Sequence, residues 1–367
     1  MRVTFSGDLV FTPLAETAMS SDSENPSTET PTKPDWTDKQ LPPVKPPTTG
    51  LLMQLFFVPM VIVSIIVGVW LMFGWLAQSG TNPEQLAANL QQLNKGSWQD
   101  AHGLSNMLFD PREEELRHNE ELANGLAEIL DKLLEDKMLE TSEERVKLAT
   151  WLCRAIGAFE IDNGLATLVK ATECENFEIR REAIKGISTL ASNLETDITE
   201  SHPNLVEQLE SPAMERAEGS ESEELMKFGE IRSTTAYALG VIGGEDATST
   251  LNLMLGDAYP EARYNAATGL ARNGDLRAVP RLCEMLSLDN DEATLYEVKE
   301  AQELRKWKRN LVIVNGLRGV KGLYSTNKEA AVDETITEAV EKLRGAAILQ
   351  RADALVLDDV MRFLNER

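Results

Sequence analysis

Residues that could catalyse a reaction or hold a metal are few and scattered in this sequence. The HExxH, GxSxG, P-loop and GxGxxG motifs, which position catalytic or phosphate-binding groups, are absent. The cysteines form no CxxC pair, and an odd number of them cannot pair completely. These candidates are Cys153, Cys174, Cys283, His102, His118 and His202. We therefore predict no catalytic residue, no metal ligand and no cofactor, and interpret Cys153 and Cys283 as buried thiols on helices.

Two clusters of charge are the candidates for partner binding. The basic cluster is Arg305-Lys306-Trp307-Lys308-Arg309, which could grip a carboxylate or a phosphate. An acidic insertion covers about residues 195–228, and residues 195–224 hold ten acids against one arginine, so this segment could capture a basic partner or a cation. Its candidate binding residues are Glu218, Glu221, Glu223 and Glu224. The simpler alternatives are a charged helix face and a solvated acidic loop.

The overall charge limits which partners are expected. A formal net charge of −24 opposes binding to nucleic acid and to anionic lipid, since both need clustered Lys and Arg. We therefore predict a protein partner and no nucleic acid.

Residues 51–77 predict a transmembrane helix. They include no charged side chain over 27 residues, and a bilayer core of about 30 Å needs about 20 apolar helical residues. The alternative is a buried core helix, although core helices rarely run past about 20 residues without a charge. Ser64 and Gly68 form a small-xxx-small pair that could support a homodimer. The predicted span is residues 51–78.

The first 50 residues predict a disordered tail rich in Pro, Ser and Thr, because they hold almost nothing apolar to bury. A secretory signal would begin with a basic segment followed by an apolar run, and these residues lack that pattern. Met19 is an alternative start to Met1. Lys33, Lys39 and Lys45 precede the span closely, whereas only Lys95 follows it within about 20 residues. This bias favours a bacterial inner-membrane protein with a cytoplasmic tail and a periplasmic C-terminal domain, although the odd cysteine count favours the opposite orientation.

Four segments of the C-terminal region align without gaps. They begin at Arg145, Arg180, Arg232 and Arg263, which are 35, 52 and 31 residues apart. Each has Ala or Ile four residues later and Leu or Ile seven residues later, which is the spacing of one helix face. A second apolar helical stretch and an acidic turn follow in each unit. Glycines 11 or 12 residues after the arginine predict left-handed helix ends.

These residues resemble HEAT repeats of the short bacterial type, also called phycobilisome-lyase-like. The resemblance covers about residues 97–325 and implies an all-α fold, a right-handed α-solenoid of helix pairs over residues 81–367. It also implies that each of the four arginines pairs with an acid of the preceding turn, forming a structural ladder. The neighbouring acids in sequence are Glu143 and Glu144, Glu175 and Glu178, Glu230, and Asp257 and Glu261. A fifth unit has Asn310 in place of the arginine, with Arg309 just before it.

The function expected from these features is a membrane-anchored, non-enzymatic scaffold for protein–protein interaction. One alternative is an accessory subunit of a membrane complex, in which the span itself makes contacts. Another is a bilin-lyase-like enzyme, but such lyases handle soluble pigment-proteins. HEAT-like di-iron hydroxylases use His-Glu pairs on repeat helices. Here the only nearby likeness is His118-Asn-Glu120, which has no counterpart in other units.

Overall fold

The computed structural model describes residues 49–78, 83–91, 96–217, 219, 222–327, 334–344 and 351–365. Within these ranges the regular structure is helical, and they contain no strand. The tail expected over residues 1–50 lies outside the described residues, apart from Thr49 and Gly50, which begin the first helix. The chain divides into two compact units, Met1–Phe73 and Gly74–Arg367, which are described separately.

The first unit contributes a long apolar helix, α1, Thr49–Gln78. Its segment Met53–Met72 is long and apolar enough to cross a membrane, and none of that segment is buried. Pro59 lies inside the helix, where the missing N–H removes one backbone hydrogen bond. Such a proline is tolerated more readily in membrane helices than in soluble ones. Length, composition and exposure therefore make α1 suited to a bilayer.

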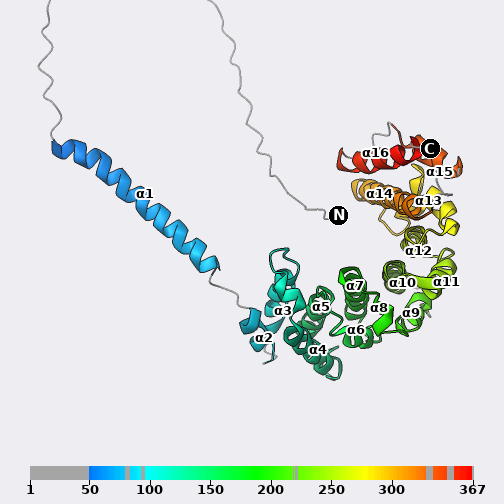
Figure 1. The fold of residues 1–367 in the computed structure, drawn as a ribbon, viewed down its shortest axis with the longest axis horizontal. Coiled ribbons are helices and arrows are strands. Elements are labelled where there is room, and N and C mark those ends of the chain that lie inside the picture. The colour runs from blue at the N-terminus through cyan, green and yellow to red at the C-terminus, as the bar shows by residue number, and fades with distance from the viewer. Residues whose placement is uncertain are drawn as a thin grey trace, which may run out of the picture. The chain divides into compact units, whose positions relative to one another are not determined.

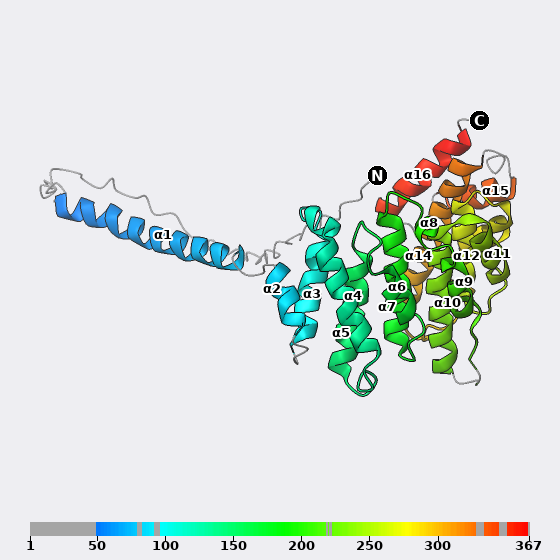
Figure 2. The ribbon, with the colours of Figure 1, turned by 60° about the horizontal axis from the view of Figure 1, so that its bottom comes forward.

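The second unit is an array of helix pairs (Figures 1 and 2). The first helices of successive pairs are α3 Ser97–Leu108, α5 Glu143–Gly157, α7 Phe177–Asn193, α10 Ser222–Ile242, α12 Pro260–Arg272 and α14 Gln302–Thr326. The second helices are α4 Glu120–Leu134, α6 Leu165–Ala171, α9 Leu205–Met214, α11 Gly244–Met254, α13 Val279–Leu286 and α15 Glu334–Lys342. The remaining helices are α2 Pro83–Leu90, η1 Glu115–His118, α8 Ile198–Ser201, η2 Leu276–Ala278, η3 Glu292–Thr294 and α16 Arg351–Asn365.

The first helices form one continuous layer of the array. Each packs against the next, from α3 through α5, α7, α10 and α12 to α14, and α16 packs against α14. Figure 1 shows this layer on the inner side of the curved array and the second helices on its outer side. The all-α solenoid expected from the sequence is therefore confirmed.

The repeated apolar positions form the core of the array. The Ala or Ile four residues after each repeat arginine is fully buried, and so is the Leu or Ile seven residues after it; these residues are Ala149, Ile184, Ala236, Ala267, Leu152, Ile187, Leu239 and Leu270. A single unit would leave this stripe exposed on one side of its helix. Stacking of neighbouring units therefore supplies the burial that holds the array together.

Glycines allow neighbouring first helices to approach closely. A Cβ on Gly186 would lie 2.7 Å from the carbonyl oxygen of Cys153, and one on Gly269 would lie 2.8 Å from Cα of Gly240. Gly157 has the same role, since its Cβ would lie 2.5 Å from Cα of Gly186.

The expected glycine turns are only partly present. Gly243 and Gly274 adopt positive φ angles of 73° and 79°, but Gly157 is helical and ends α5. The prediction was wrong for Gly157, because this glycine lies where α5 packs closely against Gly186 of α7.

The acidic insertion is largely helical. Its first part contains α8 and α9, and its last part forms the opening turns of α10. Phe228 in those opening turns packs edge-on against Phe177 of α7, with ring centroids 5.0 Å apart. Part of the extra length is therefore used for packing between units.

Candidate interaction surface

The repeat arginines lie where successive units join. Arg180 donates to the carbonyl of Thr172 and pairs with Glu215. Arg232 donates to the carbonyl of Glu215 at 3.0 Å and makes two bonds of 2.8 and 2.9 Å to the Asp257 carboxylate. Each guanidinium thus joins the turn that precedes its unit to the turn that closes it.

The next unit repeats this arrangement. Arg263 donates to the carbonyls of Asp257 and Ala258, and its Nη2 lies 3.0 Å from Glu292 Oε2 and 3.3 Å from Glu284 Oε1. Arg309 continues the pattern in the fifth unit, where it donates to the carbonyl of Asn290 and to Asp291. Arg309 therefore makes the hydrogen bonds to the turn that a repeat arginine at position 310 would make.

The acid partners inferred from the resemblance were wrong. Glu230 pairs with Arg181 and Glu261 pairs with Lys308, while the Asp257 carboxylate pairs with Arg232 and not with Arg263. The acid partner of Arg180 lies 35 residues after it, and that of Arg232 lies 25 residues after it. For Arg263 the more distant of two acid partners lies 29 residues after it. Glu230 and Glu261 each lie two residues before an arginine on the same helix, and each pairs with a different basic residue.

Arg145 is the exception among the four arginines. It pairs with Asp136, which precedes it, and neither Glu143 nor Glu144 is its partner. Glu143 instead pairs with Lys147 one helical turn later.

Arg117 was missed by sequence reasoning because it lies outside the repeated pattern, in η1. It is buried, pairs with Glu160 at 2.6 Å and donates to the carbonyl of Asp110.

The Arg232–Asp257 pair is the most enclosed of these contacts, since the Asp257 side chain has no exposed surface. Burial alone would raise the pKa of Asp257, but bonds from Arg232 and from the backbone N–H of Tyr259 outweigh it. The pKa of Asp257 therefore lies below its usual value. The carboxylate is charged at neutral pH and holds two units in register.

The basic cluster is largely used within the array. Arg305 donates to the carbonyls of Thr294 and Glu297, and Lys308 lies 2.5 Å from Glu261 and 2.6 Å from Glu297. Burial would lower the pKa of Lys308, but the two carboxylates outweigh it and raise the pKa. Lys306 and Trp307 are exposed. Of the cluster, these two side chains are the most accessible to a partner.

Two of the four acidic candidates, Glu223 and Glu224, belong to the described part of the chain. Glu218 and Glu221 lie outside the described residues. Glu223 is exposed and pairs with Lys227 at 2.8 Å, one turn along α10. Glu224 is half-buried on the same helix.

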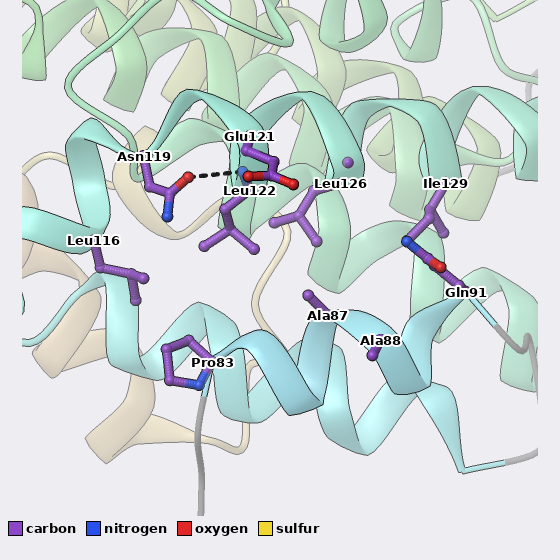
Figure 3. A pocket seen from close by; sticks show the side chains of 11 residues that line it. Pro83, Ala87, Ala88, Gln91, Leu116, Asn119, Glu121, Leu122, Leu126 and Ile129 are labelled. Atoms are coloured by element: carbon purple, nitrogen blue, oxygen red, sulfur yellow. Dashed lines mark hydrogen bonds between the residues drawn. The ribbon is translucent and has the colours of Figure 1, made fainter.

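Figure 3 shows an apolar pocket at the N-terminal end of the array. It has a volume of about 250 Å³ and lies between α2 and α4, with Ala87 facing Leu122 and Leu126. The Asn119 side chain caps α4 by accepting from the N–H of Leu122, so its amide is already in use. Glu121 is the only titratable group in the lining.

His118 of the His118-Asn-Glu120 segment lies near a carboxylate that is distant in sequence. His118 Nε2 lies 3.5 Å from Glu160 Oε2 and its side chain is exposed. Within the described residues, no group of three or more His, Cys, Asp and Glu side chains could hold a metal ion. Cys153 is fully buried as expected, and burial raises the pKa of its thiol, whereas Cys283 is only partly buried.

The sequence profile of the family described as HEAT repeats matches residues 224–301, which include the units of Arg232 and Arg263. Residues 224–301 carry HEAT repeats. HEAT repeats generally mediate protein–protein interaction. No curated protein matches this sequence significantly.

Solved structures similar to the HEAT array include two engineered proteins. One is 16% identical with a TM-score of 0.33, and the similarity covers 78% of this chain and 97% of that chain. The other is 17% identical with a TM-score of 0.39, covering 76% of this chain and 67% of that chain. Human deoxyhypusine hydroxylase in complex with glycerol is 14% identical with a TM-score of 0.29, covering 78% and 98%.

Proposed function

We propose that this protein is a non-enzymatic scaffold that holds a HEAT array at a membrane and binds a protein partner there. The observation that carries the proposal is the exposed apolar segment Met53–Met72, on the same chain as an interaction fold. In water this segment would expose a large apolar surface, whereas in a bilayer the same surface is solvated favourably.

The anchor and the array are close in sequence. Helix α1 ends at Gln78 and α2 begins at Pro83. Four intervening residues span at most about 18 Å when extended. We propose that this short connection keeps the array, from about residue 81 to residue 367, near the membrane surface. The proposed orientation has the tail in the cytoplasm and the array in the periplasm of a bacterial cell.

A homodimer through α1 is a secondary element of the proposal. Ser64 and Gly68 are exposed one turn apart, and a Cβ on Gly68 would meet nothing within 4 Å. A second helix could approach closely at this point.

The function is tested by cross-linking the tagged full chain in native membranes, solubilising it in detergent and identifying the recovered proteins. The matched control replaces residues 51–77 with an unrelated apolar helix. We expect the same partner with both chains, because the array makes the contact. Loss of the partner with the replaced span would favour an accessory subunit instead, and recovery of no specific partner would contradict the scaffold.

A further inference from the structure

A groove crosses the layer of first helices near the C-terminal end of the array. It has a volume of about 320 Å³ and is lined by α10, α12 and α14. The polar residues of its lining are Tyr237, Asn265, Thr268, Arg272, Asn315 and Arg318. No acid contributes to this lining, although the chain carries a net charge of −24.

The two arginines of the groove differ from the repeat arginines. Arg232 and Arg263 are buried and neutralised by acids, whereas Arg272 and Arg318 are exposed. The Arg272 guanidinium lies over the Tyr237 ring, 5.6 Å from its centroid, and Arg318 donates to Asn315 Oδ1 at 3.3 Å. Neither contact supplies a negative charge. Within the described part of the chain, neither arginine has an ion pair, so their charge is available to an anion.

Gly322 lines the same groove and keeps it open. A Cβ there would meet only backbone atoms of Arg272, at 3.7 and 3.9 Å, which is ordinary contact distance. A glycine inside a helix is less favourable than an alanine there. Packing does not require this glycine, in contrast to Gly319, where a Cβ would lie 2.7 Å from the Leu282 side chain. The missing side chain at residue 322 therefore leaves space beside Arg272.

An exposed apolar stripe on α14 continues the groove. It consists of Leu304, Trp307 and Leu311, which are 47%, 57% and 40% exposed. Their spacing of three and four residues, followed by seven residues to Arg318, places them on one face of the helix. At 1.5 Å per residue, Leu304 and Arg318 are about 21 Å apart along the helix axis. We call these three residues the α14 stripe.

We propose that the groove and the α14 stripe together bind an extended segment of the partner protein. The segment is about six residues long, because an extended chain rises about 3.3 to 3.6 Å per residue. Its Asp or Glu carboxylates pair with Arg272 and Arg318, and its apolar side chains pack on the α14 stripe. The inference rests on the proposed function, since it names the chemistry of the partner that the array binds.

Charge complementarity selects this occupant. Guanidinium groups match carboxylates in geometry, and aromatic and apolar side chains supply most of the binding energy at such surfaces. A basic segment would meet uncompensated positive charge in the groove.

The test uses the full-length chain in detergent as bait for a library of random decapeptides on phage. We expect the enriched peptides to combine Asp or Glu with Leu, Ile or Phe. Affinities of selected peptides are then measured by fluorescence anisotropy. Replacement of both arginines (Arg272→Glu with Arg318→Glu) should weaken binding by roughly tenfold or more, and Gly322→Leu should weaken it by filling the groove.

Two controls make the result specific. Arg154→Glu changes an exposed arginine that, like Arg272, lies nine residues after its repeat arginine and stacks on aromatic rings, but outside the groove. Binding should be unchanged in this variant. Peptides in which Lys replaces the acids should bind the double Glu variant better than the wild type. That rescue requires a folded array, so it excludes unfolding as the cause of lost binding.

Enrichment of basic peptides, no enrichment, or equal affinity for the double variant and the wild type would overturn the inference. A partner that cross-links equally to the double variant in membranes would refute this groove while leaving the scaffold function intact.

Discussion

The arginines that define the repeat differ in what surrounds their charge. Arg232 and Asp257 are almost fully enclosed, whereas Arg145 and Asp136 are both partly exposed. A buried pair is costly to desolvate, so it contributes register more than net stability. Removing one partner is a different matter, because it leaves a buried charge without compensation.

We therefore expect Asp257→Asn to destabilise the array by about 3 to 5 kcal/mol, because Arg232 would stay buried without its counter-ion. Urea unfolding of the detergent-solubilised chain, followed by circular dichroism, measures the change. The matched control is Glu143→Gln, which removes an exposed pair with Lys147 and should leave the midpoint unchanged. Equal midpoints for the wild type and Asp257→Asn would contradict the expectation that buried Arg232 depends on the Asp257 charge.

The pH dependence of stability follows from the same carboxylate. The folded-state pKa of Asp257 lies below its unfolded value, so the unfolded chain binds the proton more readily. The stabilisation is fully present above about pH 4 and is lost as the pH falls through the folded pKa. Glu284, whose pKa is also lowered in spite of burial by bonds from Arg281 and Tyr264, contributes in the same direction.

Unfolding midpoints between pH 6 and pH 3 should therefore fall less steeply for Asp257→Asn than for the wild type. An identical slope for both chains would mean that Asp257 titrates alike in the folded and unfolded states.

At the scale of helices, glycines decide how closely neighbouring units pack. Gly240 of α10 and Gly269 of α12 face each other at backbone contact distance. We expect Gly240→Ala to destabilise the array by about 1 to 3 kcal/mol, because the new Cβ would lie 2.5 Å from Cα of Gly269. Thermal unfolding measures this.

The matched control is Gly125→Ala in α4, where a Cβ would meet nothing within 4 Å. This change should be neutral or stabilising by up to about 1 kcal/mol, since alanine is the better helix former. If the two variants behaved alike, close packing of α10 on α12 would not be the reason for the glycine.

The sequence allowed the helices and their buried faces to be predicted, but not the contacts between units. Leu239 and Leu270 follow their arginines at a fixed spacing on one helix, so a local pattern was enough. The partner of Arg232 lies 25 residues later, beyond any helical period. The groove was missed for the same reason, since Tyr237 and Arg318 come from helices far apart in the chain. The basic cluster looked unpaired locally, yet Glu261 of the preceding unit reaches Lys308.

At the scale of the whole molecule, the proposed transmembrane helix places the two ends of the chain in different compartments. We predict that a periplasm-active reporter fused after residue 367 is active and that the same reporter fused before residue 1 is inactive. This prediction follows from the lysines that flank residues 51–77, since three lie shortly before the span and one lies after it. Changing Lys33, Lys39 and Lys45 to Gln should weaken the asymmetry, and the opposite reporter pattern in the wild type would reverse the proposed orientation.

Membrane flotation after an alkaline carbonate wash tests the central claim most directly. A scaffold anchored through α1 should float with the lipid, because the exposed apolar segment Met53–Met72 would be embedded in the bilayer. A chain lacking residues 51–77 should remain in the soluble fraction with its helical circular dichroism signal intact. Release of the full-length chain by carbonate would contradict the membrane-anchored scaffold.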